Sequence, residues 1–390
     1  MAHVRSRAVN LAVLVLACTT LLVACGGDDD EEASTLEAPA QGLSDYVSPH
    51  EAGTKLGNEN IARFQRLVDE GINQGNLEVM DEVLAPNILD HQWYGPGFPS
   101  SRAGIKALTA ALRTAFPDDL HAVATTLVAS NDGRQTFAII RTTGTHTGSY
   151  LGVPPTGNKV AIDIEEAARW ENGKMVEHWG VVDLLGLVSQ LGLFPPGSIP
   201  DYTPALVSDE FKQKLADPRP LNPTVALTVD QKLASVRRAL EVGVNTGDLY
   251  VDAEITSPDY VEYEFYGPGF PDGVERHKAA IAVNRTALPD LSTRILQLEA
   301  IGEGEHVFGI FKAAGTNLGP FLGIPPTGNP IEIDVFEYFH FDENGKVNVH
   351  NGIADLLGLV DQLGFIPPGS VPAYSPDKID PQFRASVLRG

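Results

Sequence analysis

The sequence predicts an α+β fold that is built twice within one chain. Long stretches return at an offset of 171 or 172 residues: residues 94–99 return as 266–271, 144–158 as 315–329, and 183–192 as 355–364. A period of this length indicates a duplicated domain, because the repeats of solenoid proteins are only about 20–50 residues long. Within each copy, helical spacing of apolar residues comes first and a run of strand-like segments follows.

Each copy begins with a pattern that is typical of an amphipathic helix. Apolar residues lie three and four positions apart over residues 61–72, and they do so again over residues 233–244. A short second helix is expected next, and we expect it to close at Pro86 in the first copy and at Pro258 in the second.

The rest of each copy is predicted to be mostly strands. In the first copy a short strand over 88–94 and a helix over 102–115 precede four strands over 123–128, 135–142, 160–170 and 174–182. Glycine-containing turns separate the four strands, so we expect them to form antiparallel hairpins. A short helix then begins at Asp183, whose side chain is suited to cap it, and Asp355 is its equivalent.

Composition divides the chain further. The predicted segments are a signal peptide at 1–24, an acidic disordered tether at 25–53, a first domain at 54–216, a linker at 217–227 and a second domain at 228–390. The tether contains five consecutive acidic residues, which repel one another. Each domain includes a Pro-rich tail, because the stretch at 195–200 returns at 367–372.

The first 25 residues indicate export. Arg5 and Arg7 precede an apolar stretch that is too short to span a membrane. The stretch ends in Leu-Val-Ala-Cys, which resembles a bacterial lipobox and implies lipidation of Cys25. We therefore expect a protein that is lipid-anchored to the cell envelope, on the outer face of the cytoplasmic membrane or in the outer membrane. The alternative is ordinary signal cleavage that leaves Cys25 free.

Charge narrows the range of partners. The formal net charge of the chain is −23. Such a charge disfavours binding to nucleic acid or to an anionic membrane surface. We expect membrane contact only through the N-terminal lipid.

The repeated motifs resemble the SnoaL-like polyketide cyclase family, which includes ester cyclases and belongs to the NTF2-like superfamily. Those motifs are Phe-Pro-Asp at 116–118, the glycine- and proline-rich stretch at 144–157, Glu-His-Trp at 177–179 and Asp-Leu-Leu-Gly at 183–186. The resemblance implies two tandem NTF2-like barrels, each a cone-shaped curved antiparallel sheet closed by helices. It also implies a small apolar organic ligand or substrate, no metal and no cofactor, and two domains paired as an intramolecular pseudo-dimer.

The family's catalytic residues are not kept in this chain. Family members close a polyketide ring with an aspartate, helped by a histidine and a glutamine. The resemblance places these three positions, in the two copies, at Gly180 and Gly352, at Glu166 and Glu337, and at Ile164 and Val335. The motifs therefore predict the fold more firmly than they predict aldol chemistry.

A carboxylate and a histidine recur on neighbouring strands of both copies. Glu166 and Glu337 lie in phase with apolar residues, where an unpaired carboxylate costs several kcal/mol. His178 and His350 on the next strand are the expected partners. The four residues are our candidates for catalysis, and three interpretations are open: acid/base catalysis, ligand recognition, or a buried pair that only specifies the fold.

Further residues are predicted to line the two pockets. They are His91, Trp93, His146, Ile164, Gly180, Tyr263, Phe265, Val335 and Gly352. The two glycines are expected to leave open space beside the histidines. A metal site is not expected, because His91 and His146 match no ligand spacing and are Tyr263 and Asn317 in the second copy. If only one pocket works, the first copy is the better candidate.

Two functional hypotheses follow. The first is an enzyme that performs cofactor-independent acid/base chemistry, such as aldol closure, isomerisation or hydrolysis, on a small apolar molecule. The second is a lipoprotein that binds such a molecule in two pockets without changing it.

Overall fold

The computed structural model describes residues 53–194, 200–216, 227–264, 266–366 and 369–389, with the backbone alone at 252 and 253. The predicted signal peptide, Cys25, almost all of the tether and of the linker, and Phe265 lie outside the described residues. Within the described part of the chain, no helix is long and apolar enough to cross a membrane.

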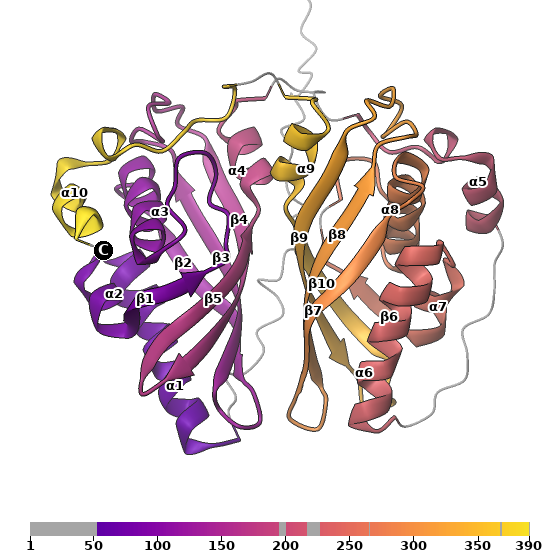
Figure 1. Ribbon diagram of the computed structural model, residues 1–390, viewed down its shortest axis with the longest axis horizontal. Coiled ribbons are helices and arrows are strands. Elements are labelled where there is room, and N and C mark those ends of the chain that lie inside the picture. Colours follow the sequence, from indigo (N-terminus) through magenta and orange to yellow (C-terminus); the bar gives the residue numbers. More distant parts are fainter. Residues whose placement is uncertain (1–52, 195–199, 217–226, 265, 367–368, 390) are drawn as a thin grey trace, which may run out of the picture. The chain divides into compact units, whose positions relative to one another are not determined.

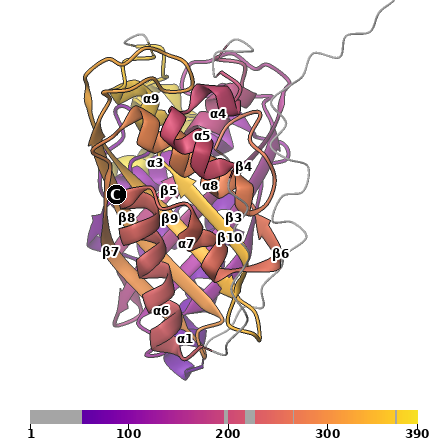
Figure 2. The same ribbon diagram turned by 90° about the vertical axis from the view of Figure 1, so that its right-hand side faces the viewer.

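Each repeat forms one five-stranded sheet, and helices pack against one of its faces (Figure 1), which confirms the predicted α+β fold. The first sheet has the order β1-β5-β4-β3-β2 and the second has the order β6-β10-β9-β8-β7. Figure 2 shows α6, α7 and α8 in front of the strands of the second sheet.

The elements of the first repeat are α1 (Lys55–Arg66), the π-helix η2 (Leu67–Asn73), α2 (Glu78–Val83), β1 (Leu84–Asp90), α3 (Arg102–Ala115), β2 (His121–Ala129), β3 (Gln135–Thr145), β4 (Lys159–Glu171), β5 (Lys174–Val182), α4 (Leu184–Gln190), η3 (Pro204–Leu206) and α5 (Asp209–Leu215). The elements of the second repeat are α6 (Val229–Arg238), the π-helix η4 (Ala239–Val244), α7 (Tyr250–Ile255), β6 (Thr256–Glu262), α8 (Val274–Ala287), β7 (Ser292–Ile301), β8 (His306–Thr316), β9 (Pro330–Phe341), β10 (Val347–Ala354), α9 (Leu356–Gln362), η5 (Pro376–Lys378) and α10 (Pro381–Leu388).

The predicted apolar stripe of the first helix packs into the core of its repeat. Ile61, Phe64 and Val68 belong to the same buried cluster as Ile140 on β3 and Met175 on β5. Asp183 accepts a hydrogen bond from the Gly186 amide at 2.7 Å, and Asp355 accepts one from Gly358 at 2.8 Å, so both aspartates cap their helices as predicted.

Two details of β1 and β6 differ from the expectation. Pro86 does not close a helix but lies inside β1, and Pro258 lies inside β6. Both strands are edge strands, where a residue without an N–H is tolerated. In addition, β1 pairs with β5 in parallel, and β6 pairs with β10 in parallel, whereas the remaining pairs are antiparallel as expected.

The sheet faces that carry no helices contribute to one buried cluster made of residues from both repeats. Phe137 stacks on Phe308 with ring centroids 5.0 Å apart, and Ala167 and Val349 belong to the same cluster. The contacts are reciprocal, because β4 contacts β10 while β5 contacts β9.

The tail of each repeat packs on the other repeat. Tyr202 in the first tail bonds through its amide to the carbonyl of Pro268, and Tyr374 in the second tail bonds in the same way to Pro96. Gly97 has a φ of +84° and leaves room for the Tyr374 carbonyl, which would lie 2.5 Å from a β-carbon at that position. The two tails are therefore exchanged between the repeats.

Candidate functional site

The parallel pairing of β1 with β5 brings an acidic residue beside each buried histidine. Asp90 is the register partner of His178, and Glu262 is the register partner of His350. Both pairs lie at the end of the edge strand, where its backbone leaves the sheet. The site in each repeat is therefore assembled from three strands, with Glu166 or Glu337 contributed by the third.

In the first repeat, His178 lies between two carboxylates. Its Nδ1 is 3.0 Å from Asp90 Oδ1 and its Nε2 is 3.6 Å from Glu166 Oε2. The hydroxyl of Tyr94 also donates to Asp90, at 3.2 Å. Burial opposes a charged ring, but the two carboxylates outweigh it and raise the pKa of His178 to about 10. His178 is therefore an imidazolium at neutral pH.

The second repeat has the same arrangement with closer contacts. His350 is 1% exposed; its Nδ1 is 2.9 Å from both Glu262 oxygens, and its Nε2 is 3.2 Å from Glu337 Oε2. Burial disfavours the charged ring, but Glu262 and Glu337 raise the pKa of His350 well above its ordinary value. The same ion pair outweighs burial and lowers the pKa of Glu262.

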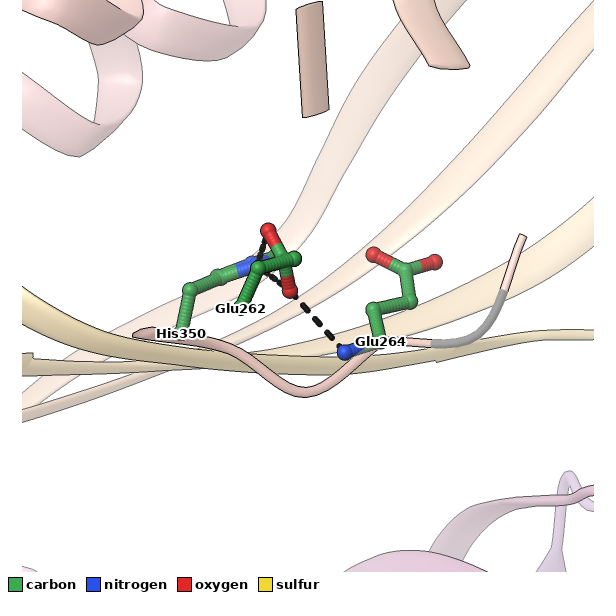
Figure 3. Close-up of side chains that lie close together, drawn as sticks. All are labelled: Glu262, Glu264 and His350. Carbon is green, nitrogen blue, oxygen red and sulfur yellow. Dashed lines mark hydrogen bonds and ion pairs between the residues drawn. The ribbon is translucent and has the colours of Figure 1, made fainter. Parts of the chain in front are cut away.

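The second repeat adds a further carboxyl group that the sequence analysis missed. Glu264 is 4% exposed, and its side chain lies on the same side of the strand as Glu262 and the His350 ring (Figure 3). The hydroxyl of Tyr266 donates to Glu264 Oε2. Burial and the nearby Glu337 charge raise the pKa of Glu264 to about 8, although His350 opposes them. Glu264 is therefore mostly protonated at neutral pH.

The two repeats differ most in the size of their cavities. In the first repeat, the cavity beside the Glu-His pair measures about 40 Å³ and is bordered by Glu166 and His178. The second-repeat cavity measures about 110 Å³, and its wall is apolar apart from a few groups that include Glu264, Glu337, Tyr266 and His277.

Three residues that line the second-repeat cavity are smaller than their equivalents in the first repeat. At an offset of 172 residues, Leu108, Phe116 and Val182 of the first repeat become Ala280, Leu288 and Ala354 in the second. All three of the smaller residues line the second-repeat cavity. Of the two cavities beside the Glu-His pairs, the larger one is in the second copy, and the expectation that the first copy is the better candidate for function stays a prediction.

Three groups in the second repeat meet the distance requirement for a metal site. Ligand atoms of Glu262, Glu264 and His350 lie within 4.8 Å of one another. However, each ring nitrogen of His350 faces a carboxylate, so the imidazolium has no lone pair to offer a metal ion. We interpret the cluster as a network that shares protons.

Three predicted pocket residues point away from the cavities. His91 pairs with Glu177 at 3.0 Å and stacks on Trp179, Trp93 is 40% exposed, and Tyr263 packs against the cluster that both repeats share. The reason is strand alternation, which turns residues 90, 92 and 94 inward and residues 91 and 93 outward. The predicted inward-facing residues of this segment were therefore one position out of phase with the observed ones.

The predicted role of the glycines was also wrong. A β-carbon on Gly180 would lie 2.4 Å from Gln92 Oε1, and one on Gly352 would lie 2.7 Å from Glu264 Oε2. The space beside each histidine is therefore filled by a side chain that lies two residues after the end of the edge strand. One sequence signal pointed to this strand, because tyrosine occupies position 94 and its equivalent 266 in both copies.

Of the remaining predicted pocket residues, one lines a cavity, one is buried in the core and one lies in a hairpin loop. Val335 lines the second-repeat cavity, and Ile164 is buried in the core of the first repeat. His146 is fully buried in a hairpin, where its Nδ1 lies 3.0 Å from the Thr156 hydroxyl, and Asn317 binds Thr327 in the same way. These two residues hold the Gly-x-Pro-Pro-Thr-Gly turn in place.

Comparison with known proteins supports the same family for both repeats. A profile described as "SnoaL-like polyketide cyclase" matches residues 62–191 and 234–363. Among curated proteins no match is found.

Several solved structures are similar to one repeat. A putative SnoaL-like polyketide cyclase from Jannaschia sp. CCS1 is 23% identical, covers 39% of this chain and 100% of its own, and has a TM-score of 0.31. TsrD from Streptomyces laurentii is 28% identical, with 35% and 96% covered and a TM-score of 0.30. IdmH, a putative polyketide cyclase from Streptomyces antibioticus, is 27% identical, with 34% and 98% covered and a TM-score of 0.29.

Proposed function

Because the chain belongs to the SnoaL-like polyketide cyclase family, we propose that its second repeat binds a small, largely apolar organic molecule and acts on it by acid/base chemistry without a cofactor. The observation that carries this proposal is the second-repeat cavity, in which Glu337 and Glu264 border an otherwise mostly apolar wall. A carboxylate held by an imidazolium and a protonated carboxyl group on one cavity provide a base and an acid.

The volume limits the size of the ligand. An apolar cavity of about 150 Å³ binds benzene. The second-repeat cavity, at about 110 Å³, is therefore suited to a molecule of one small ring or a short branched chain. A molecule with several fused rings requires the cavity to open.

In this proposal the first repeat has a structural role. Its Glu166–His178–Asp90 network is complete, but the adjoining cavity of about 40 Å³ leaves no room for an organic ligand. This same observation favours the second candidate function, a binding protein without catalysis. The network of the first repeat has no ligand site beside it and therefore stabilises or specifies the fold. The network of the second repeat can have the same structural role.

Binding can be tested with toluene, followed by NMR titration of the whole chain. We expect wild-type protein to bind toluene and Ala280→Leu to lose binding, because leucine restores the side chain that fills this position in the first repeat. Leu108→Ala in the first repeat is the matched control: the second-repeat site should still bind toluene, in addition to any site that this variant opens in the first repeat. Absence of binding to wild-type protein, or equal binding by Ala280→Leu, contradicts the proposal.

An experiment with the natural ligand can distinguish an enzyme from a binding protein. Small molecules extracted from protein purified from its native source can be identified by mass spectrometry and returned to the wild type and to Glu337→Gln. Conversion by the wild type alone supports the enzyme. Binding by both proteins without conversion supports the binding protein.

We also propose that the protein is exported and anchored by lipid at Cys25. The support is the Leu-Val-Ala-Cys sequence after a basic, then apolar, N-terminus. Mass spectrometry of the native N-terminal peptide should find a chain that starts at Cys25 with a lipid thioether. An unmodified Cys25, or a start elsewhere, contradicts the proposal.

The two repeats are proposed to act as a lasting intramolecular pseudo-dimer. The shared cluster around Phe137 and Phe308 and the exchanged tails support it. Proteolytic cleavage between residues 217 and 226 should leave both halves associated during gel filtration. Separation of the halves without denaturant contradicts this proposal.

A further inference from the structure

The position of Glu264 distinguishes the second repeat from the first. Its equivalent at an offset of 172 is Gln92, which lies over Gly180 as Glu264 lies over Gly352. Gln92 is not among the residues that line the first-repeat cavity beside His178, whereas Glu264 lines the second-repeat cavity. The second repeat thus has an additional acidic group at the point where it also has additional space.

The surroundings of Glu264 contain more negative than positive groups. Glu262 and Glu337 flank His350 on its two ring nitrogens, so the imidazolium is already shared between two carboxylates. The other titratable groups that face the cluster are Tyr260, Tyr266 and His277. Glu165 of the first repeat lies on the opposite face of the second sheet, where Asn351 on β10 donates a hydrogen bond to it. A third buried negative charge is therefore disfavoured, and Glu264 holds its proton.

The geometry leaves one oxygen of this carboxyl group for a ligand. Oε2 accepts the hydrogen bond from Tyr266. Figure 3 shows that the carboxyl group of Glu264 has no hydrogen bond to Glu262 or His350, and that only its backbone amide is bonded to Glu262, at 2.9 Å. The acid proton on the remaining oxygen can point towards the cavity that the residue lines.

We propose that Glu264 acts as a neutral acid that donates a hydrogen bond to a carbonyl oxygen of the bound molecule, and that the ligand class of the second repeat is a small apolar ketone or a related carbonyl compound. This inference rests on the proposed function, because it requires the second-repeat cavity to be a ligand site. A neutral donor in an apolar cavity matches an acceptor without a charge. The negative charge of Glu337 repels carboxylate ligands and so excludes them.

The same geometry specifies a reaction class. Glu337 takes a proton from the carbon next to the carbonyl, so that the C–H bond breaks and its electron pair forms a C=C bond. The π electrons of the carbonyl move to its oxygen, where the hydrogen bond from Glu264 stabilises the enolate. Return of the proton from Glu337 to carbon completes an isomerisation or exchange. No electron, oxidant or further reactant is consumed.

The test uses cyclopentanone, whose oxygen accepts but cannot donate a hydrogen bond, and cyclopentane as an apolar control of similar size. Wild-type protein should bind cyclopentanone more tightly than cyclopentane and lower the C=O stretching frequency of the bound ketone. Glu264→Ala should reduce ketone affinity about tenfold, abolish the frequency shift and leave cyclopentane binding within twofold. Gln92→Ala in the first repeat is the matched control and should change neither measurement.

Two further measurements address the protonation state and the base. The frequency shift should disappear as the pH rises above about 8, where Glu264 loses its proton. In D2O the wild type should accelerate exchange of the hydrogens next to the carbonyl, and Glu337→Gln should remove this acceleration while it preserves ketone binding. Should Glu264→Ala fail to fold, Glu264→Gln keeps a donor and is expected to keep the frequency shift at every pH.

The possible failures are distinguishable. If the wild type binds neither probe, the cavity is not a ligand site, and the proposed function and this inference fail together. If cyclopentane binds but cyclopentanone has no advantage and no frequency shift, Glu264 is not a donor. In that case this inference is overturned and the proposed binding function stands.

Discussion

The carboxyl group of Glu264 packs directly against Gly352: one of its oxygens lies 2.7 Å from the point that a β-carbon on residue 352 would occupy. The second repeat therefore places an acid from its edge strand over β10, the strand that carries His350. The first repeat uses Gln92 over Gly180 for the same contact. Because the strand residue is glycine in both repeats, the edge strand decides which chemical group borders each histidine.

We expect Gly352→Ala to displace the Glu264 carboxyl group and lower the free energy of unfolding by about 1–2 kcal/mol. The reason is a contact that is too short for a methyl group, against a side chain held by Tyr266. In a Glu264→Ala background the same change should cost clearly less. Urea unfolding of the two single variants and the double variant measures the coupling, and simple additivity would contradict the prediction.

The pH dependence of stability should reveal the buried acid. Burial and the Glu337 charge raise the pKa of Glu264 from its ordinary value of 4.5 to about 8. Between these values the folded state keeps a proton that the unfolded state has released, so the stabilisation is complete below pH 4.5 and is lost as the pH rises through about 8.

Glu264→Gln has no such proton to lose. The free energy of unfolding of Glu264→Gln, relative to that of the wild type, should therefore increase between pH 5 and pH 8 by an amount on the order of 3 kcal/mol. Urea unfolding at pH 5, 6.5 and 8 tests this difference. A constant offset between the two proteins at all three values would show that Glu264 does not titrate in this range.

His178 should stay protonated far above neutral pH. Burial disfavours its charge, but Asp90 and Glu166 raise its pKa to about 10. The stabilisation from this pairing is complete below pH 6.5 and is lost as the pH rises through about 10. In 15N NMR both ring nitrogens should carry protons at pH 8. Asp90→Asn should move the titration towards neutral pH, and an unchanged titration would rule out Asp90 as a cause.

We expect truncation of Leu108, the first-repeat equivalent of the cavity-lining Ala280, to open space in the first repeat. Leu108 is 8% exposed within the core, so Leu108→Ala should cost about 2–4 kcal/mol of stability. It should also create a second binding site for toluene, beside Glu166, that the wild type lacks. Toluene stoichiometry by NMR decides this, and a stoichiometry of one in the variant would show that other side chains close the space.

The sequence was informative wherever a pattern depends on local geometry. The helix at 102–115 and the strand at 174–182 have the predicted bounds, and Asp183 and Asp355 cap their helices. The pairing of His178 with Glu166 also followed from alternation on adjacent strands, and the structure places the two groups 3.6 Å apart. Their role in catalysis stays a prediction.

Long-range pairing was beyond the sequence. Asp90 and Glu262 reach the histidines only because the edge strand pairs in parallel with a strand 88 residues away, and no local pattern specifies that partner. The phase of residues 90–94 was missed, because His91 and Trp93 were expected to line the pocket and Trp93 is 40% exposed. Cavity size was also inaccessible, since it depends on how many side chains from different elements pack together.

The exchanged tail of the second repeat completes the packing of the first repeat. Lys106, which is fully buried, binds Asp81 at 2.8 Å and the backbone carbonyl of Ser386 at 3.0 Å, and Tyr374 stacks on Phe98. These contacts do not exist while the second repeat is still being synthesised. The first repeat therefore depends on a segment about 280 residues further along the chain for one partner of its buried ammonium group. A variant truncated before Tyr374 therefore lacks contacts that complete the core of the first repeat, although the first domain itself is unchanged in sequence.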